Sequence, residues 1–177
     1  MSLALDVRHT DEMAAGELAE LRDMLVDCFS PRYDESAWAH CLGGTHYLLR
    51  HRGQLVSHGA LIPRHFEQAG RELRGLYGES MATVPNLRGR GLGSIVLAAA
   101  TADILMHHEI GVFAASKYHF YERLGWLKWP GETYVVAADG RRPAAPARGA
   151  VMYRLPPGST IDPAGDLAAD WRAGDIW

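Results

Sequence analysis

The sequence changes character abruptly at Pro85, and this change constrains the fold more than any other feature. Residues 72–84 before it form a strand-length segment, and residues 92–107 after it form a continuous apolar segment of helix length. Between them lies the glycine-rich loop Arg88-Gly89-Arg90-Gly91-Leu92-Gly93. Glycines let a backbone approach a ligand, and the free N–H groups of a helix start attract anions. The pattern indicates an α/β protein with a pyrophosphate cradle, to which the two arginines add positive charge.

The remaining segments predict a mixed sheet. A short strand is expected over 4–7, helices in the run after Thr10 and over 35–41, and strands over 45–50, 55–64 and 72–84. Short turns between these strands favour antiparallel hairpins. Beyond helix 92–107, strand 110–115, helix 117–124 and strands 132–137 and 151–155 are expected, with 139–148 a loop by composition. We predict a single α/β domain over residues 1–177, with a mixed antiparallel and parallel central sheet flanked by helices.

Composition narrows the class of protein. A chain of 177 residues that is 47% hydrophobic can bury a single core. Its net charge of -3 argues against nucleic acid as a partner. No apolar run approaches the ~20 residues of a membrane-spanning helix, and the start lacks the plan of a signal peptide, so we expect a cytoplasmic protein without a membrane partner. Cys28 and Cys41 make no disulfide framework and are expected to be buried thiols.

Other interpretations of the loop and of the histidines fit less well. A dinucleotide-binding fingerprint would need glycine where Ser94 stands, and a Walker-type loop would need a Gly-Lys-Ser/Thr ending that the chain lacks. An ordinary glycine-rich turn with solvated arginines stays open. The histidines, the pair His107-His108 included, show no metal-binding spacing, so no metal is expected.

Two motifs resemble those of the GNAT acetyltransferases. Arg88, Gly91 and Gly93 match their coenzyme A signature Arg-x-x-Gly-x-Gly, and residues 121–126, Tyr-Glu-Arg-Leu-Gly-Trp, are similar to their Tyr-x-x-x-Gly-Phe/Trp element. A likeness to the aminoglycoside 2'-N-acetyltransferases of that superfamily covers essentially the whole chain. It is carried by Leu42-Gly43-Gly44-Thr45-His46, by Tyr77-Gly78-Glu79 and by the ending Asp170-Trp171-Arg172-Ala173-Gly174-Asp175-Ile176-Trp177. The resemblance implies a GNAT fold, acetyl-CoA as co-substrate and a homodimer.

The resemblance also implies roles for individual residues. Glu79 is the expected general base, acting through a water, and Tyr121 is the expected general acid that protonates the coenzyme A sulfur. The Met81 N–H is expected to polarise the thioester carbonyl. Coenzyme A is expected to contact Met81, Ala82, Thr83, Arg88, Gly89, Arg90, Gly91, Leu92, Gly93 and Ser94. The expected substrate-binding residues are Arg32, Glu79, Ser80, Ser116, Asp175 and Trp177.

The chain departs from this resemblance where the family is acidic. The acidic residue after the first helix falls at Arg32, and the acidic cluster before the last strand falls at Ala147-Arg148. Arginines would repel a polycation but pair with a carboxylate, and kasugamycin is an aminoglycoside antibiotic that carries one. Kasugamycin is therefore the predicted substrate and antibiotic resistance the predicted outcome. A solvated Arg32 without a role is the simpler alternative.

Three other functions stay open. The enzyme could act broadly on 4,6-disubstituted aminoglycosides, or it could acetylate protein lysines or N-termini. A chain of another class, a catalytically silent acyl-CoA-binding module that regulates a partner, would keep the glycine-rich loop but need neither Glu79 nor Tyr121.

Overall fold

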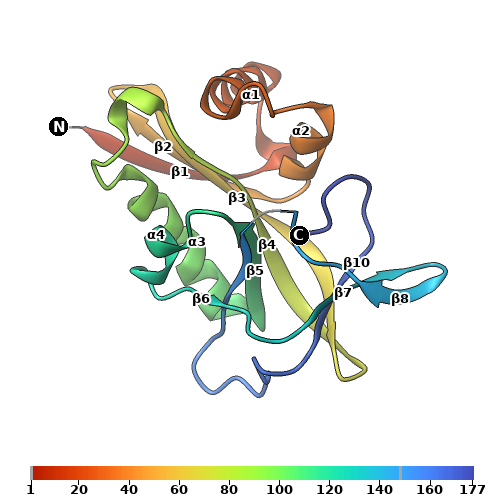
Figure 1. Cartoon of the computed structure of the whole chain (residues 1–177). Helices are drawn as coiled ribbons and strands as arrows, with labels where there is room; N and C mark the ends of the chain where they lie inside the picture. Colours follow the sequence, from red (N-terminus) through yellow and green to blue (C-terminus); the bar gives the residue numbers. More distant parts are fainter. Residues whose placement is uncertain (1, 148) are drawn as a thin grey trace. The chain divides into compact units, whose positions relative to one another are not determined.

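A computed structural model describes residues 2–147 and 149–177 (Figure 1). The chain divides into two compact units: unit 1 comprises Met1–Ile62 and Gly78–Ala100, and unit 2 comprises Pro63–Tyr77 and Thr101–Trp177. Three elements contribute residues to both units, namely β3 (Gln54–Gln68), β4 (Arg71–Thr83) and α3 (Leu92–His107). The predicted single domain over the whole chain stays a prediction.

Unit 1 begins with a strand, a short 3-10 helix, two α-helices and a second strand. They are β1 (Leu3–His9), the short 3-10 helix Thr10–Glu12, α1 (Ala15–Phe29), α2 (Glu35–Cys41) and β2 (Thr45–His51). Asp34 caps α2, because its carboxylate accepts the Ala37 N–H at 2.9 Å. β2 pairs antiparallel with β3, as the short turn between them predicted, and also antiparallel with β1.

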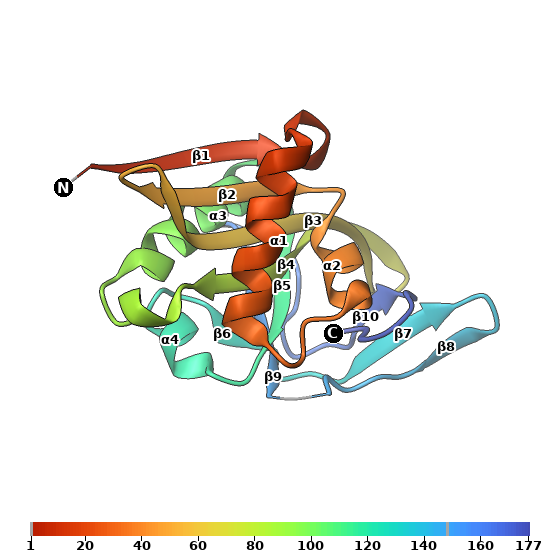
Figure 2. The same ribbon diagram turned by 90° about the horizontal axis from the view of Figure 1, so that it is seen from above.

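Helices cover both faces of the unit 1 strands, and successive residues of β3 point alternately to one face and to the other. Ala60 faces a buried apolar cluster to which α1, lying across the strands in Figure 2, contributes Leu21 and Leu25. Gly59 faces the other way, toward Met81 and Val96 of α3. Each fully buried leucine of this cluster contributes about 1.5–3 kcal/mol.

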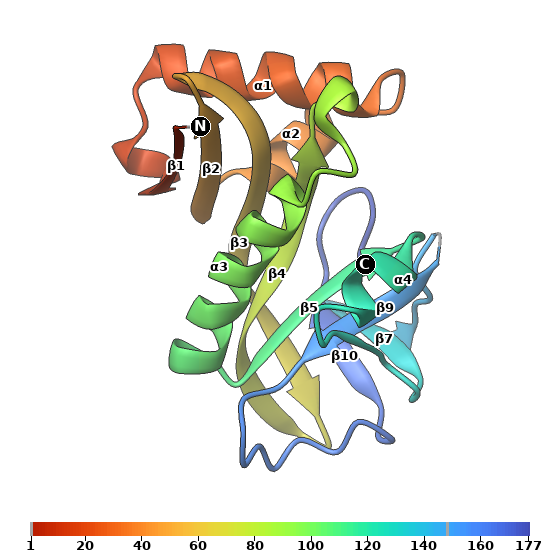
Figure 3. The ribbon, with the colours of Figure 1, turned by 90° about the vertical axis from the view of Figure 1, so that its left-hand side faces the viewer.

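Unit 2 holds the rest of the sheet (Figure 3). Its further elements are β5 (Ile110–Ala115), α4 (Tyr118–Glu122), β6 (Leu127–Lys128), β7 (Thr133–Ala137), β8 (Gly140–Pro143), β9 (Ala150–Arg154) and β10 (Leu167–Asp170). The strand order is β6-β9-β5-β4-β3-β10-β7-β8. β4 pairs parallel with β5, and β7 with β10, whereas β5 and β9 are antiparallel. The predicted mixed sheet is confirmed.

Trp126 is the central core residue of unit 2. It is fully buried, its ring lies 4.4 Å from that of Phe113, and its Nε1 donates to Thr101 Oγ1 at 3.0 Å. A Cβ on Gly111 of β5 would overlap Ile104 of α3, so the second half of the helix packs closely on this strand. The tryptophan of the Tyr-x-x-x-Gly-Trp element therefore has a packing role.

The expected loop over 139–148 is wrong in part, because Gly140–Pro143 forms β8, which pairs antiparallel with β7. Its residues are all exposed, so no alternation of apolar side chains revealed it. The Arg141 guanidinium instead stacks 4.0 Å from the Tyr134 ring centroid. β6 and β10 were not predicted either. Within the described residues, no helix has the length and apolar character needed to cross a bilayer.

Candidate active-site residues

The part of β4 that belongs to unit 1 carries the predicted base and the predicted coenzyme-binding backbone. Ser80, directly after Glu79, has a left-handed backbone with a φ of 52°. Of the described non-glycine residues with positive φ, the other two, Arg52 and Ala69, lie in hairpin turns. Ser80 is different because it lies inside a strand, where such a conformation costs about 1–3 kcal/mol and persists only if the surroundings impose it.

Glu79 and Ser80 have a phenol and a thiol beside them. The Tyr33 hydroxyl lies 3.3 Å from Ser80 Oγ, and the Cys41 thiol is hydrogen-bonded to Tyr33 and Ser80. Burial raises the pKa of Cys41 to about 12, and the negative charge of Glu79 adds to this effect. Burial also raises the pKa of Tyr33 well above its usual value, again with a contribution from Glu79. The two neighbours are therefore neutral hydrogen-bonding groups at pH 7. Neither residue was expected at the site from the sequence.

The next residues of β4 are held from β3. Ser57 Oγ donates to the Ala82 carbonyl at 2.8 Å and lies 2.9 Å from Thr83 Oγ1. The Met81 side chain lies directly over Gly59, where any Cβ would overlap its sulfur. This part of the strand is therefore fixed by its own unit.

The glycine-rich loop contains left-handed glycines and leads directly into a helix. Gly89 and Gly91 are left-handed, with φ of 76° and 81°, and α3 begins at Leu92. The first N–H groups of a helix have no acceptor within it, so this end can bind an anion. Arg88 also has a structural role: its guanidinium donates to the Thr83 carbonyl at 3.0 Å and to the Cys28 carbonyl at 3.3 Å. Arg90 is exposed.

Tyr121, the predicted acid, lies in α4 of unit 2. Its ring packs against Phe113 at 4.5 Å and against Phe120 at 5.0 Å between centroids. Burial raises its pKa to about 12, so the phenol keeps its proton at neutral pH. Ser116, which follows β5, is exposed.

The C-terminal segment is anchored in unit 2 by Arg64, a residue that was not expected to have this role from the sequence. Arg64 is only 6% exposed; its Nε donates to Asp170 Oδ1 at 3.0 Å, and its other nitrogens donate to the carbonyls of Asp170 and Ile176. Trp177 stacks on Phe66 and is 5% exposed, whereas Asp175 is exposed. A signal existed in the sequence, because Arg64 alternates with the apolar Ile62 and Phe66 along β3.

Two guanidinium groups face Tyr77 of the Tyr-Gly-Glu motif. Arg64 lies 5.1 Å and Arg172 4.9 Å from its ring centroid, and its hydroxyl accepts the Ala114 N–H at 3.1 Å. Burial, together with the charge of Arg172, lowers the pKa of Arg64. Trp177 Nε1 is buried and has no hydrogen-bond partner among the residues that the structure describes. An N–H of this kind is available to a ligand atom.

The structure describes only one of the two arginines on which the substrate hypothesis rests. Arg32 is exposed and forms no ion pair with any residue in the ranges 2–147 and 149–177. Its charge is therefore available to a ligand. Arg148 lies outside the described residues.

Comparison with known proteins identifies relatives over almost the whole chain. Residues 9–128 match the model of the acetyltransferase (GNAT) domain family. The chain is 30% identical over 174 residues to an aminoglycoside 2'-N-acetyltransferase of Mycolicibacterium fortuitum, a match that covers 96% of this chain and 89% of the relative.

Solved structures show the same fold at lower identity. A GNAT family acetyltransferase from Brucella melitensis, in complex with acetyl-CoA, has a TM-score of 0.63 and 16% identity, covering 96% of this chain and 97% of that one. A GNAT family N-acetyltransferase from Escherichia coli, in complex with CoA, has a TM-score of 0.66 and 14% identity, covering 96% and 91%. These likenesses confirm the fold class expected from the sequence.

Proposed function

The chain belongs to the GNAT acetyltransferase family, and we propose that it transfers the acetyl group of acetyl-CoA to the 2'-amino group of an aminoglycoside antibiotic. Membership makes it an acyltransferase. The observation that carries the substrate class is the match to the Mycolicibacterium fortuitum enzyme, because it extends over 96% of the chain. A match confined to the coenzyme-binding part would support only acetyl-CoA as the donor and would not support a substrate class.

Acetyl-CoA is the proposed donor. Two solved structures with this fold contain acetyl-CoA or CoA. The left-handed Gly89 and Gly91 and the N-terminus of α3 are suited to its pyrophosphate. The backbone of Met81, Ala82 and Thr83 would pair with the pantetheine arm like an added strand.

The proposed chemistry is direct transfer. The amine is mostly protonated at pH 7, so a base must remove a proton before its nitrogen attacks the thioester carbonyl. Glu79 would take this proton through a water, and the Met81 N–H would stabilise the developing oxyanion. As the carbon–sulfur bond breaks, Tyr121 would give its proton to the thiolate. The Tyr121 phenol carries its proton at pH 7 and can therefore give it to the thiolate.

Kasugamycin is the aminoglycoside that we propose as preferred substrate. The exposed Arg32, without an ion-pair partner in the described part of the chain, supports recognition of a carboxylate. Asp175 would bind the amino groups, Trp177 would contact the antibiotic, and Ser80 and Ser116 would add hydrogen bonds. Acetylation of the antibiotic would confer resistance.

The test is turnover of kasugamycin, gentamicin and tobramycin under the same conditions, followed by release of the coenzyme A thiol. We expect the highest kcat/KM for kasugamycin. Because an exposed ion pair contributes about 1 kcal/mol or less, Arg32→Asp should lower that preference about three- to fivefold. The control Arg52→Asp, the same charge change in an exposed turn, should not.

Two results would contradict this proposal at different levels. Faster acetylation of gentamicin or tobramycin would refute kasugamycin as the preferred substrate and support a broad aminoglycoside enzyme. A lack of thiol release with every amine would instead support the silent acyl-CoA-binding module. The homodimer implied by the resemblance stays a prediction, which sedimentation would test.

A further inference from the structure

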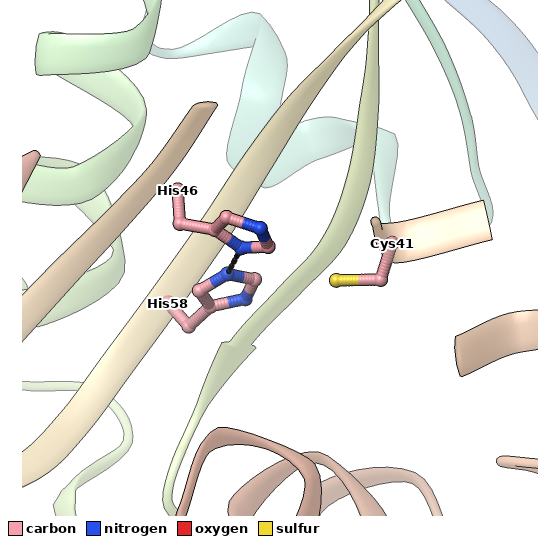
Figure 4. Close-up of side chains that lie close together, drawn as sticks. All are labelled: Cys41, His46 and His58. Atoms are coloured by element: carbon pink, nitrogen blue, oxygen red, sulfur yellow. Dashed lines mark hydrogen bonds between the residues drawn. The ribbon is translucent and has the colours of Figure 1, made fainter. Parts of the chain in front are cut away.

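Two buried histidines of unit 1 form the centre of a hydrogen-bonded chain (Figure 4). His46 of β2 and His58 of β3 are fully buried, and His46 Nδ1 lies 3.0 Å from His58 Nε2. Their outer nitrogens have partners as well. His46 Nε2 lies 2.8 Å from Thr10 Oγ1, and His58 Nδ1 lies 3.0 Å from the Ser80 carbonyl oxygen. Thr10, His46, His58 and Ser80 are thus linked in series.

The direction of these bonds follows from the last acceptor. A carbonyl oxygen only accepts, so His58 Nδ1 carries a proton and, in a neutral ring, Nε2 does not. His46 Nδ1 must then donate to His58, and the Thr10 hydroxyl must donate to His46 Nε2. That nitrogen is closer to Thr10 Oγ1 than the competing Gly44 carbonyl, which lies at 3.2 Å. The Thr10 oxygen accepts from the Gly43 and Gly44 N–H groups at 2.9 and 3.3 Å. This arrangement satisfies every polar atom with both rings neutral.

The electrostatic environment agrees with neutral rings. Burial, with the charge of His9 adding to it, lowers the pKa of His46 to about 4. Burial and the neighbouring His46 lower the pKa of His58 to about 3. Neither ring carries a charge at pH 7.

The chain of bonds ends on a peptide unit with a special position. The Ser80 carbonyl and the Met81 N–H belong to the same planar, trans peptide, so they point in opposite directions and move together. A bond that holds the Ser80 carbonyl toward His58 therefore aims the Met81 N–H away from it. Tyr33 and Cys41 hold the Ser80 side chain at the same time. Together these contacts account for a left-handed serine inside a strand.

We propose that His58, oriented by His46 and Thr10, is a positioning residue that aims the Met81 N–H and sets the direction of Glu79 on the other side of Ser80. The inference rests on the proposed function, in which Met81 polarises the thioester carbonyl and Glu79 is the base. In this role His58 touches neither substrate nor coenzyme, and it acts only through the Ser80–Met81 peptide.

A metal site is the competing interpretation of the same cluster. Cys41 Sγ and one nitrogen of each ring lie within 4.8 Å of one another. A metal would have to displace the proton shared by the two rings and the thiol proton of Cys41, whose pKa burial raises to about 12. The hydrogen-bonded chain needs neither step and is therefore favoured.

The first experiment reads the tautomers directly, by nitrogen-15 NMR of the histidine rings in the full chain. We expect both rings neutral with the proton on Nδ1, and unchanged signals after addition of one equivalent of Zn²⁺. A proton on His58 Nε2 would overturn the proposal. Zinc-induced shifts of both rings would overturn it in favour of the metal site.

The second experiment separates positioning from packing. His58→Leu removes the donor to Ser80, whereas the amide N–H of His58→Asn lies near the position of Nδ1 and can replace it. Because loss of one oxyanion donor costs about 10²–10³ in kcat, we expect His58→Leu to lower kcat at least about tenfold with the KM for acetyl-CoA within about twofold. His58→Asn should recover most of the loss. His65→Leu, the same change at an exposed position of β3, is the control.

An equal loss of kcat in His58→Leu and His58→Asn, or no loss of kcat in either, would overturn the positioning role. If His58→Leu does not fold, the proposal is still tested by the histidine tautomers of the wild-type chain and by the activity of His58→Asn. A wild-type protein that acetylates no aminoglycoside would refute the proposed function alone. The backbone chemical shifts of Ser80 would then test the inference: the left-handed signature should persist in His58→Asn and disappear in His58→Leu, and its persistence in both would overturn the proposal.

Discussion

Several residues of this chain depart from local preference. Ser80 is left-handed inside a strand, Arg64 is a buried cation, and the phenol of Tyr121 is desolvated by burial. Each departure costs free energy unless specific partners offset it. Such positions are where function is most often found in a fold that is otherwise locally consistent.

Glu79→Gln tests the base at this scale. It keeps the shape of the side chain but removes the proton acceptor, so kcat for acetyl transfer should fall about 10²-fold or more. The Kd for coenzyme A should stay within about twofold, because the glycine-rich loop is unchanged. Glu72→Gln, on the same strand and exposed, is the matched control. A kcat for Glu79→Gln close to that of this control would rule out Glu79 as the base.

Tyr121→Phe tests the acid. The ring and its packing on Phe113 and Phe120 remain, so stability should change little while kcat falls about 10²-fold. Tyr118→Phe, in the same short helix, should have wild-type kcat. A Tyr121→Phe enzyme that keeps full activity would show that the thiolate leaves without this proton.

At the scale of elements, the functional segments depend on braces from their own unit. Arg88 ties the glycine-rich loop to the Thr83 and Cys28 carbonyls, and Arg64 ties the C-terminal segment to β3. In both cases one arginine satisfies several backbone oxygens at once. An irregular segment is held in one conformation in this way without a core of its own.

Gly91→Ala tests whether the loop conformation matters. A left-handed backbone costs an alanine about 1–2 kcal/mol, so coenzyme A binding, measured by calorimetry, should weaken about five- to thirtyfold. Gly16→Ala lies in helix α1 with no atom near the added Cβ and should instead stabilise the protein by about 0.5 kcal/mol. Unchanged binding in Gly91→Ala would mean that the loop does not hold the coenzyme.

Arg64→Met tests the anchor of the C-terminal segment. Loss of the bonds to Asp170 and Ile176 should lower the free energy of unfolding by about 1–3 kcal/mol and speed hydrogen exchange over residues 170–177. Arg71→Met removes an exposed ion pair with Glu109 and should cost about 1 kcal/mol or less. Equal effects of the two substitutions would contradict the anchoring role.

For the molecule as a whole, the buried histidine pair links stability to pH. In the unfolded chain both rings titrate near pH 6.5, but in the folded chain their pKa values are about 4 and about 3. The unfolded state therefore binds more protons between these limits, and stability is lost as the pH falls below 6.5.

The measurement is chemical denaturation between pH 6.5 and 5, above the range in which carboxylates titrate. Each histidine should contribute a slope of up to about 1.4 kcal/mol per pH unit, which the double variant His46→Asn/His58→Asn should lack. The charge of His9 acts on His46, so His9→Asn serves as the control. A slope that the double variant retains would place the pH dependence elsewhere.

The sequence by itself determined the locally encoded elements and the family. Helices 35–41 and 92–107 and strand 110–115 were predicted with the bounds that the structure has, because caps, glycines and apolar runs act over a few residues. The motifs around Arg88, Tyr121 and the C-terminus pointed to the GNAT acetyltransferases, which the comparisons confirm.

Only the tertiary structure decided which distant residues meet. β8 and β10 exist because their backbones pair with β7, and no pattern within either segment requires a strand. Ser80 is held by Tyr33 from the segment before α2, by Cys41 of α2 and by His58 of β3. Arg64 is buried only because Asp170 and Ile176 supply its acceptors. The physical reason is the same in each case. A buried polar group is tolerated where its partners are, and the fold chooses those partners, not the spacing along the chain.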